Sequence, residues 1–215
     1  MIAVVDYAMG NLRSVCHALS EAAGAEPVRL TAAPAELADA SHIVLPGVGN
    51  FRAGMKTLAE RGLDEALVRL VRDEGRPFLG ICLGMQLLAE TGEEDGASPG
   101  LGILPGRTRR IRAEGLPVPH IGWDDVTLTE AAGPIPRELS GTDFYFVHSY
   151  VFDAPGDLVA GWCTYGERFP AAVCRDNVLG VQFHPEKSRR PGLDLLRSFL
   201  QGKACSRSAW FLPCC

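Results

Sequence analysis

The residue of this chain best suited to chemistry is Cys82, which stands between two glycines where an apolar segment gives way to a helical pattern. Residues 77–81 predict a strand, and Gly80-Ile81-Cys82-Leu83-Gly84 has the G-x-C-x-G spacing of a nucleophile elbow. Such a turn projects the thiol at the start of a helix expected over residues 83–90, where free N–H groups and the helix dipole favour the thiolate. A buried structural cysteine beside a glycine-rich turn fits the same motif, so the elbow alone leaves both interpretations open.

A second candidate group is His184, which follows the apolar, strand-like residues 178–183 and precedes Pro185 and Glu186. Side chains two residues apart in an extended chain point to the same side, so Glu186 could hold the imidazole in one tautomer. The other ring nitrogen would then take a proton from a thiol, as in a Cys-His-Glu triad. A His-Pro-Glu tripeptide on its own is more often a turn, and only the fold can bring His184 to Cys82.

The run Pro46-Gly47-Val48-Gly49-Asn50 directly follows the strand predicted over residues 42–45. Gly47 and Gly49 allow unusual dihedral angles, so the N–H of Val48 could be aimed at a developing oxyanion beside the N–H of Leu83. An ordinary turn from strand to helix explains this motif equally simply. Neither phosphate-loop pattern, G-x-x-x-x-G-K-[ST] or G-x-G-x-x-G, is present.

The elements that must position these groups alternate between strand and helix. Strand-like residues 2–6, 27–30 and 42–45 are separated by helical patterns over residues 12–23 and 63–71, which predicts an α/β fold with a mostly parallel central sheet and helices on both faces. Short strand-like segments at 107–111, 120–127 and 143–151 predict an antiparallel extension. Residues 91–99 read as a surface loop. We expect one domain over residues 1–202 and a tail, 203–215, outside its core.

Composition narrows the class of protein. The chain has 215 residues, of which 47% are hydrophobic, and a net charge of -5. This charge argues against a nucleic-acid-binding surface, and no apolar run is long enough to predict a membrane span. Seven cysteines, an odd number without zinc-site spacing, predict reduced thiols, no metal site and a cytoplasmic location. The arginines at 107, 109, 110 and 112 are most simply a solvated face, with contact to an acidic partner as the alternative.

In the order oxyanion loop, nucleophile, histidine and glutamate, these segments resemble the class I (triad) glutamine amidotransferase family over about residues 1–201. That family hydrolyses glutamine to glutamate and ammonia through a cysteine thioester and passes the ammonia to a synthase partner. The resemblance implies that Cys82 is the nucleophile, His184 the general base and acid, and Glu186 the residue that orients it. It implies no cofactor, and it assigns a glutamine pocket to Gln86, His148, Ser149 and Tyr150.

Narrower motifs resemble one branch of that family, the glutaminase subunits of imidazole glycerol phosphate synthases. They are Asp6-Tyr7-Ala8-Met9-Gly10-Asn11-Leu12-Arg13-Ser14, Pro46-Gly47-Val48-Gly49, Pro119-His120-Ile121-Gly122-Trp123, Phe144-Tyr145-Phe146-Val147-His148-Ser149-Tyr150 and His184-Pro185-Glu186-Lys187-Ser188. The resemblance implies a heterodimer with a (β/α)₈-barrel cyclase, which uses the ammonia with the nucleotide PRFAR to make imidazole glycerol phosphate and AICAR in histidine biosynthesis. It places the subunit interface and ammonia exit at Asn11, Trp123, Tyr145 and Lys187.

Three other interpretations compete with this one. The chain could be the glutaminase of a different synthase, such as the pyridoxal phosphate or anthranilate systems, although the Pro-Gly-Val-Gly and His-Ser-Tyr segments argue against it. A non-catalytic subunit that only regulates a partner is disfavoured by the intact Cys82, His184 and Glu186. A cysteine hydrolase with a similar elbow leaves residues 7–14 unexplained. If the resemblance holds, the resting chain is a poor glutaminase whose Val48 N–H points away from the oxyanion site.

Overall fold

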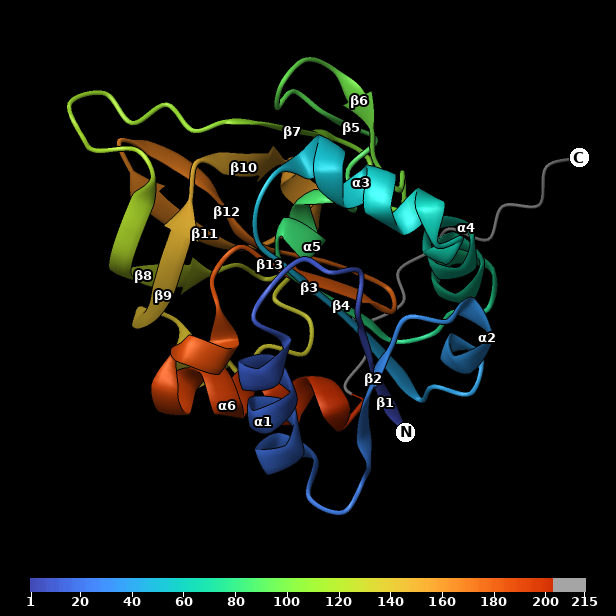
Figure 1. Cartoon of the computed structure of the whole chain (residues 1–215). Coiled ribbons are helices and arrows are strands. Elements are labelled where there is room, and N and C mark those ends of the chain that lie inside the picture. The colour runs from blue at the N-terminus through green and yellow to red at the C-terminus, as the bar shows by residue number, and fades with distance from the viewer. Residues whose placement is uncertain (203–215) are drawn as a thin grey trace, which may run out of the picture.

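The computed structural model describes residues 1–202, and its centre is a nine-stranded sheet (Figure 1). Five neighbouring strands are parallel, in the order β2 (Val28–Thr31), β1 (Ile2–Val5), β3 (His42–Gly47), β4 (Phe78–Cys82) and β13 (Val178–Val181). Four antiparallel strands extend the sheet, namely β12 (Glu167–Arg175), β11 (Val159–Tyr165), β8 (His120–Leu128) and β9 (Thr142–His148). The expected α/β fold with a parallel centre and an antiparallel extension is confirmed.

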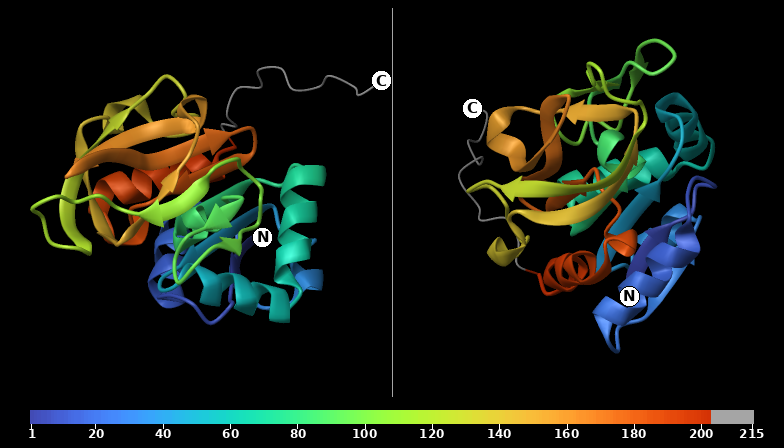
Figure 2. Two further views of the ribbon diagram at one scale, coloured as in Figure 1. Left: turned by 90° about the horizontal axis from the view of Figure 1, so that it is seen from above. Right: turned by 90° about the vertical axis from the view of Figure 1, so that its left-hand side faces the viewer.

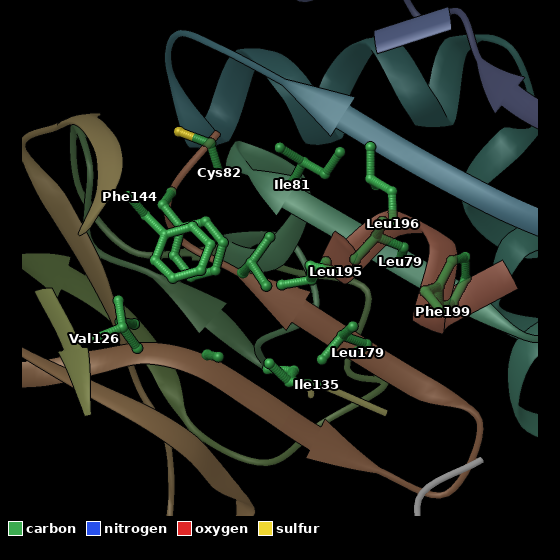
Figure 3. Packing of buried hydrophobic residues seen from close by; sticks show 14 of the residues in the cluster. Leu79, Ile81, Cys82, Val126, Ile135, Phe144, Leu179, Leu195, Leu196 and Phe199 are labelled. Atoms are coloured by element: carbon green, nitrogen blue, oxygen red, sulfur yellow. The ribbon is translucent and has the colours of Figure 1, made fainter. Parts of the chain in front are cut away.

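Helices cover the parallel part of the sheet on both faces (Figures 1 and 2). On one face α1 (Leu12–Ala23) packs beside α6 (Arg189–Leu200), and on the other lie α2 (Pro34–Leu37), α3 (Phe51–Glu60) and α4 (Leu63–Val68), which continues as a π-helical turn, Arg69–Asp73. The central strands β1 and β4 are buried along their whole length, as parallel strands covered on both sides must be. Two apolar cores result, and Figure 3 shows one of them, with Cys82 at its edge.

Polar caps fix where the helices near the sheet edge begin. The Asn11 side chain accepts a hydrogen bond from the Ser14 N–H at 3.4 Å and starts α1, which ends at Gly24 as its sequence pattern predicts. Asn50 does the same for α3, accepting from the Ala53 N–H at 2.9 Å. Because Asn50 directly follows Gly49, the loop predicted to carry an oxyanion donor is anchored at the first turn of a helix.

A second, four-stranded sheet corrects three expectations, the first of which is that residues 107–111 extend the large sheet: Arg107–Arg110 is a strand of the small sheet. It contains β10 (Tyr150–Asp153), β7 (Arg107–Arg110), β5 (Thr91–Gly92) and β6 (Ser98–Pro99). Residues 91–99 are therefore a β-hairpin and not a plain surface loop. The expectation of a single strand over residues 143–151 is also wrong. The strand is interrupted at Ser149, where the polypeptide passes from β9 in the large sheet to β10 in the small sheet.

The helix after the elbow is shorter than the sequence predicts. The element α5 (Leu83–Gln86) ends at Gln86, since the Leu88 and Ala89 N–H groups bond to the carbonyls of Met85 and Gln86 in turn geometry. No helix within residues 1–202 is long and apolar enough to cross a membrane. The expected tail, residues 203–215, lies outside the described part of the chain, so the predicted domain boundary stays a prediction.

Candidate active site

The sheet brings the predicted nucleophile and base together. Strands β4 and β13 are parallel neighbours, with Ile81 opposite Val181 in the ladder. Their carboxyl ends therefore meet at the same edge, where β4 ends at Cys82 and the chain beyond β13 reaches His184. This edge of a parallel sheet is where ligands bind in open α/β folds.

The backbone at Cys82 has the strained geometry of a nucleophile elbow. Its φ of 52° and ψ of -108° lie in a region that residues with a Cβ rarely adopt. The flanking glycines permit the turn, because a Cβ on Gly84 would lie 1.8 Å from the Leu45 carbonyl oxygen, and a Cβ on Gly80 would lie 2.6 Å from the Gly84 oxygen. Both glycines of the motif are therefore required by close backbone contacts, and the thiol stands at the start of α5.

His184 and Glu186 form a buried pair, but not through the geometry that the sequence suggested. The Nδ1 of His184 lies 2.8 Å from the Oε1 of Glu186, and both side chains are about 3% exposed. Residues Pro185–Lys187 form a 3₁₀ turn that begins just after His184, so the two side chains meet across one turn of helix and not along an extended strand. The carboxylate accepts from Nδ1–H, which leaves Nε2 as the free nitrogen.

The free Nε2 of His184 is buried and has no hydrogen-bond partner within residues 1–202. Burial opposes a charge on the ring, but the neighbouring Cys82 and the Glu186 carboxylate outweigh burial and raise the pKa of His184 to about 9. In the resting geometry the Cys82 Sγ lies 3.8 Å from the Val147 carbonyl oxygen. The arrangement suits a proton transfer from sulfur to Nε2, because an imidazolium formed there is stabilised.

A pocket of about 390 Å³ opens above Cys82 and gathers most of the predicted site residues. From the sequence prediction its lining includes Val48, Gly49, Leu83, Gln86, His148, Ser149 and Tyr150. Gly47 does not line it. That glycine lies beneath the loop, where a Cβ would come 2.1 Å from the Tyr7 hydroxyl and 3.0 Å from the Leu83 Cβ. Gly47 thus permits close packing under the loop and offers no direct contact to a ligand in the pocket.

The structure adds pocket residues that the sequence interpretation missed, namely Asn50, Glu94, Pro119 and Val147. Glu94 is the most informative, since its carboxylate accepts a hydrogen bond from the Phe51 N–H at 2.7 Å and brings a negative charge to the pocket. It was missed because residues 91–99 read as a loop. An acidic residue in a glycine-rich turn gives no sign of position until the hairpin folds it against α3.

His148 lies in the pocket wall as a neutral ring. Burial, with smaller contributions from His120 and His184, lowers the pKa of His148 to about 3. Its Nδ1 bonds to the Tyr150 carbonyl at 3.0 Å and its Nε2 faces the Nδ1 of His120 at 3.0 Å. Both nitrogens are therefore occupied by the protein, which makes His148 a part of the wall and not a free acid or base.

Three of the four predicted interface residues form one surface cluster. The Trp123 and Tyr145 rings lie edge to face with centroids 5.8 Å apart, and the Lys187 Nζ lies 5.4 Å from the Tyr145 ring. Trp123 is 39% exposed, which is high for so large an apolar side chain. Asn11 is not in this cluster; it caps α1, which packs against the turn that carries Lys187.

One arginine of the strand Arg107–Arg110 does not belong to the solvated face that the sequence predicts. Arg109 is 8% exposed and forms a bidentate pair with Glu167, at 2.6 and 3.0 Å, plus a bond of 3.2 Å to Asp153. It therefore fastens the small sheet to β12 and is not part of a solvated face. Across residues 1–202, no three His, Cys, Asp or Glu side chains gather closely enough to hold a metal ion.

The chain is similar in sequence to known proteins over almost its whole length. A model of the family "Glutamine amidotransferase class-I" matches residues 3–202. The chain is 49% identical to the imidazole glycerol phosphate synthase subunit HisH of Gloeobacter violaceus, over 97% of this chain and 92% of the relative. It is 46% identical to the subunit of the same name from Streptococcus gordonii, over 93% of this chain and 95% of the relative.

Solved structures agree on the fold. A crystal structure of a glutamine amidotransferase matches with a TM-score of 0.70 at 22% identity, covering 94% of this chain and 98% of that one. The structure of PurLQS from Thermotoga maritima matches with a TM-score of 0.70 at 20% identity, covering 93% and 97%. The chain belongs to the class I glutamine amidotransferase family, and within it to the HisH subunits of imidazole glycerol phosphate synthase.

Proposed function

We propose that this chain hydrolyses glutamine to glutamate and ammonia at Cys82. The observation that carries the proposal is the strained elbow at Cys82, which lines the pocket, beside a buried His184–Glu186 pair. A cysteine held at positive φ costs free energy, and that cost is typical of sites where the backbone must aim a reactive group. Membership of the family supports the same reaction.

The reaction proceeds in two halves. His184 Nε2 takes the thiol proton, and the thiolate attacks the side-chain amide carbon of glutamine to give a tetrahedral oxyanion. The N–H groups of Val48 and Leu83 stabilise that oxyanion. His184 then returns the proton to the nitrogen, ammonia leaves and a thioester remains. Water attacks the thioester, with His184 as base, and the collapse of this second intermediate releases glutamate and restores the thiol.

The pocket has groups suited to the two ends of glutamine. The Glu94 carboxylate would pair with the α-ammonium group of glutamine. Gln86, one helical turn beyond Cys82, would contact the substrate from the wall formed with Ser149 and Tyr150. These contacts give a preference for an amino acid over a simple amide.

We further propose that the ammonia passes to a (β/α)₈-barrel cyclase subunit that converts PRFAR to imidazole glycerol phosphate and AICAR. The name shared by the relatives, a synthase subunit, supports a partner of this kind. The exposed cluster of Trp123, Tyr145 and Lys187 is the surface we assign to the partner. In this proposal residues 1–202 suffice for catalysis in the cytoplasm, and deletion of residues 203–215 leaves the rate unchanged.

The test measures glutamate release by the chain alone, with the cyclase subunit, and with the cyclase subunit and PRFAR. We expect a low rate alone and the highest rate with both, together with AICAR formation from glutamine. The reason is that Gly47 and Gly49 allow the loop to change conformation, so partner contacts can shift its population. No glutamate in any of the three mixtures would refute the proposed function, and equal rates in all three would refute the activation.

A further inference from the structure

A buried amide, Gln182, lies beside the nucleophile and does not itself line the pocket. It directly follows β13, is 0% exposed and has its Nε2 3.6 Å from the Cys82 Sγ. Besides His184, the sulfur therefore has two polar neighbours of opposite character. The Val147 carbonyl can only accept and favours the thiol, whereas an N–H from Gln182 favours the thiolate.

The effect of Gln182 depends on which end of its amide faces the sulfur, and the neighbouring hydrogen bonds fix that end. The Tyr150 carbonyl can only accept, so the atom of Gln86 that lies 2.9 Å from it must be the Nε2. The second hydrogen of that nitrogen points at the Gln182 Oε1 at 3.1 Å. With its oxygen used in this way, Gln182 has its NH₂ group directed at Cys82.

The chain of hydrogen bonds continues beyond Tyr150 to the surface of β8. His148 donates from Nδ1 to the same Tyr150 carbonyl, so the Nε2 of this neutral ring accepts from the Nδ1–H of His120 at 3.0 Å. The Nε2 of His120 lies 2.7 Å from the Asp124 Oδ2, so a ring that donates from both nitrogens is an imidazolium paired with that carboxylate; burial opposes this charge and lowers the pKa of His120. His120 is 1% exposed and the Asp124 side chain is 39% exposed, so this series of hydrogen bonds runs from a surface carboxylate to the buried sulfur.

We propose that Gln182 donates a hydrogen bond to Cys82 as the thiolate forms, and that Gln86, His148 and His120 are positioning residues that hold its amide in this orientation. The inference rests on the proposed function, because it concerns the same nucleophile. His184 and the buried Tyr7 hydroxyl are the titratable groups that also interact with Cys82, and neither contacts Gln182 through a hydrogen bond within residues 1–202. Gln182 therefore acts on the sulfur separately from the histidine.

The first experiment replaces Gln182 by Leu, which keeps much of the volume and removes the donor, and by Glu, which places an acceptor at the sulfur. Alkylation of Cys82 by iodoacetamide is followed against pH by mass spectrometry of the peptide that carries it. We expect the alkylation profile to move to higher pH in both variants, further in Gln182→Glu. At pH 7 a charge-assisted hydrogen bond corresponds to about a tenfold to hundredfold fall in rate. The matched control is Gln201→Leu, an exposed amide at the end of α6.

The kinetic readout separates this role from a structural one. In Gln182→Leu the kcat for glutamate release with partner and PRFAR should fall by a similar factor, while KM changes little. A melting temperature close to that of the unmodified chain shows that the fold is kept; if the Leu variant does not fold, Gln182→Met serves instead. A folded variant with an unchanged alkylation profile would overturn the proposal. Because alkylation needs no turnover, an inactive chain with the expected shift would refute the glutaminase and not the role of Gln182.

The positioning claim has its own test. His148→Leu removes the donor that shares the Tyr150 carbonyl, so the alkylation profile should move in the same direction as in Gln182→Leu but less far. In the double variant the two effects should be less than additive, because the amide whose orientation His148 supports is already gone. His148→Gln can donate to the same carbonyl and should restore the profile. Fully additive effects, or no effect of His148→Leu, would refute the positioning role of His148 and leave only the direct contact between Gln182 and Cys82.

Discussion

Replacing Val48 by Pro tests the oxyanion donor directly. Proline has no N–H, so the variant keeps the Leu83 donor at the start of α5 and loses the other. Losing one of two such donors typically lowers kcat by about 100-fold to 1,000-fold, or about 3 to 4 kcal/mol of transition-state stabilisation. The Val48 side chain contributes little to the stability of the fold, because it is 40% exposed. Replacing it by a smaller side chain therefore removes only a small buried apolar area.

The control for this experiment is Val48→Ala, which shortens the side chain and keeps the N–H. Both variants are assayed for glutamate release in the complex with the cyclase subunit and PRFAR, and their melting temperatures are compared. We expect Val48→Ala to stay within about threefold of the unmodified chain and Val48→Pro to fall by at least about 100-fold. If the two folded variants had similar rates, the Val48 N–H would not be the oxyanion donor.

Three further predictions concern the nucleophile, a buried ion pair and pH. Cys82→Ala should abolish glutamine-dependent AICAR formation while added ammonium salts still support it, which a coupled assay distinguishes. Arg109→Met should lower the free energy of unfolding by about 1 to 3 kcal/mol in urea titrations, because the partly buried Glu167 carboxylate would lose both guanidinium hydrogen bonds and keep only the one from the Arg112 N–H. The pKa of His184 is raised to about 9, so its contribution to stability is full below about pH 6.5 and is lost as pH rises through 9. The pKa of His148 is lowered to about 3, so its contribution is lost as pH falls below 6.5; urea titrations from pH 4 to 10 should therefore show greatest stability near pH 6.5 to 7.

The parts of the site that could be predicted from the sequence are those encoded by short contiguous motifs. The elbow at Cys82 follows from two glycines at fixed spacing, each of which the backbone requires for close packing. The pairing of His184 with Glu186 was also expected, but the expected extended geometry was wrong. Proline at the first position of a 3₁₀ turn brings the two side chains together just as well.

The parts that could not be predicted depend on contacts between distant segments. Glu94 reaches the pocket only because a short hairpin packs against the start of α3, and nothing in its local sequence indicates that contact. Arg109 sits in a run of exposed arginines, and its burial is decided by Glu167, which lies on another sheet. Gln182 follows an apolar strand, where a polar residue reads as an interruption until its hydrogen-bond partners are known.

The ladder between β4 and β13 also has a consequence for how the enzyme matures. The nucleophile is encoded in the first half of the chain and the base just after β13, the last strand in chain order, so a ribosome-bound or truncated chain that lacks β13 and the residues after it has a cysteine without its histidine. Such long-range pairing is slow to form, because a large loop must close before any contact is gained. Ammonia production is thereby withheld from incomplete chains, and the return of activity during refolding reports closure of the sheet and not mere collapse.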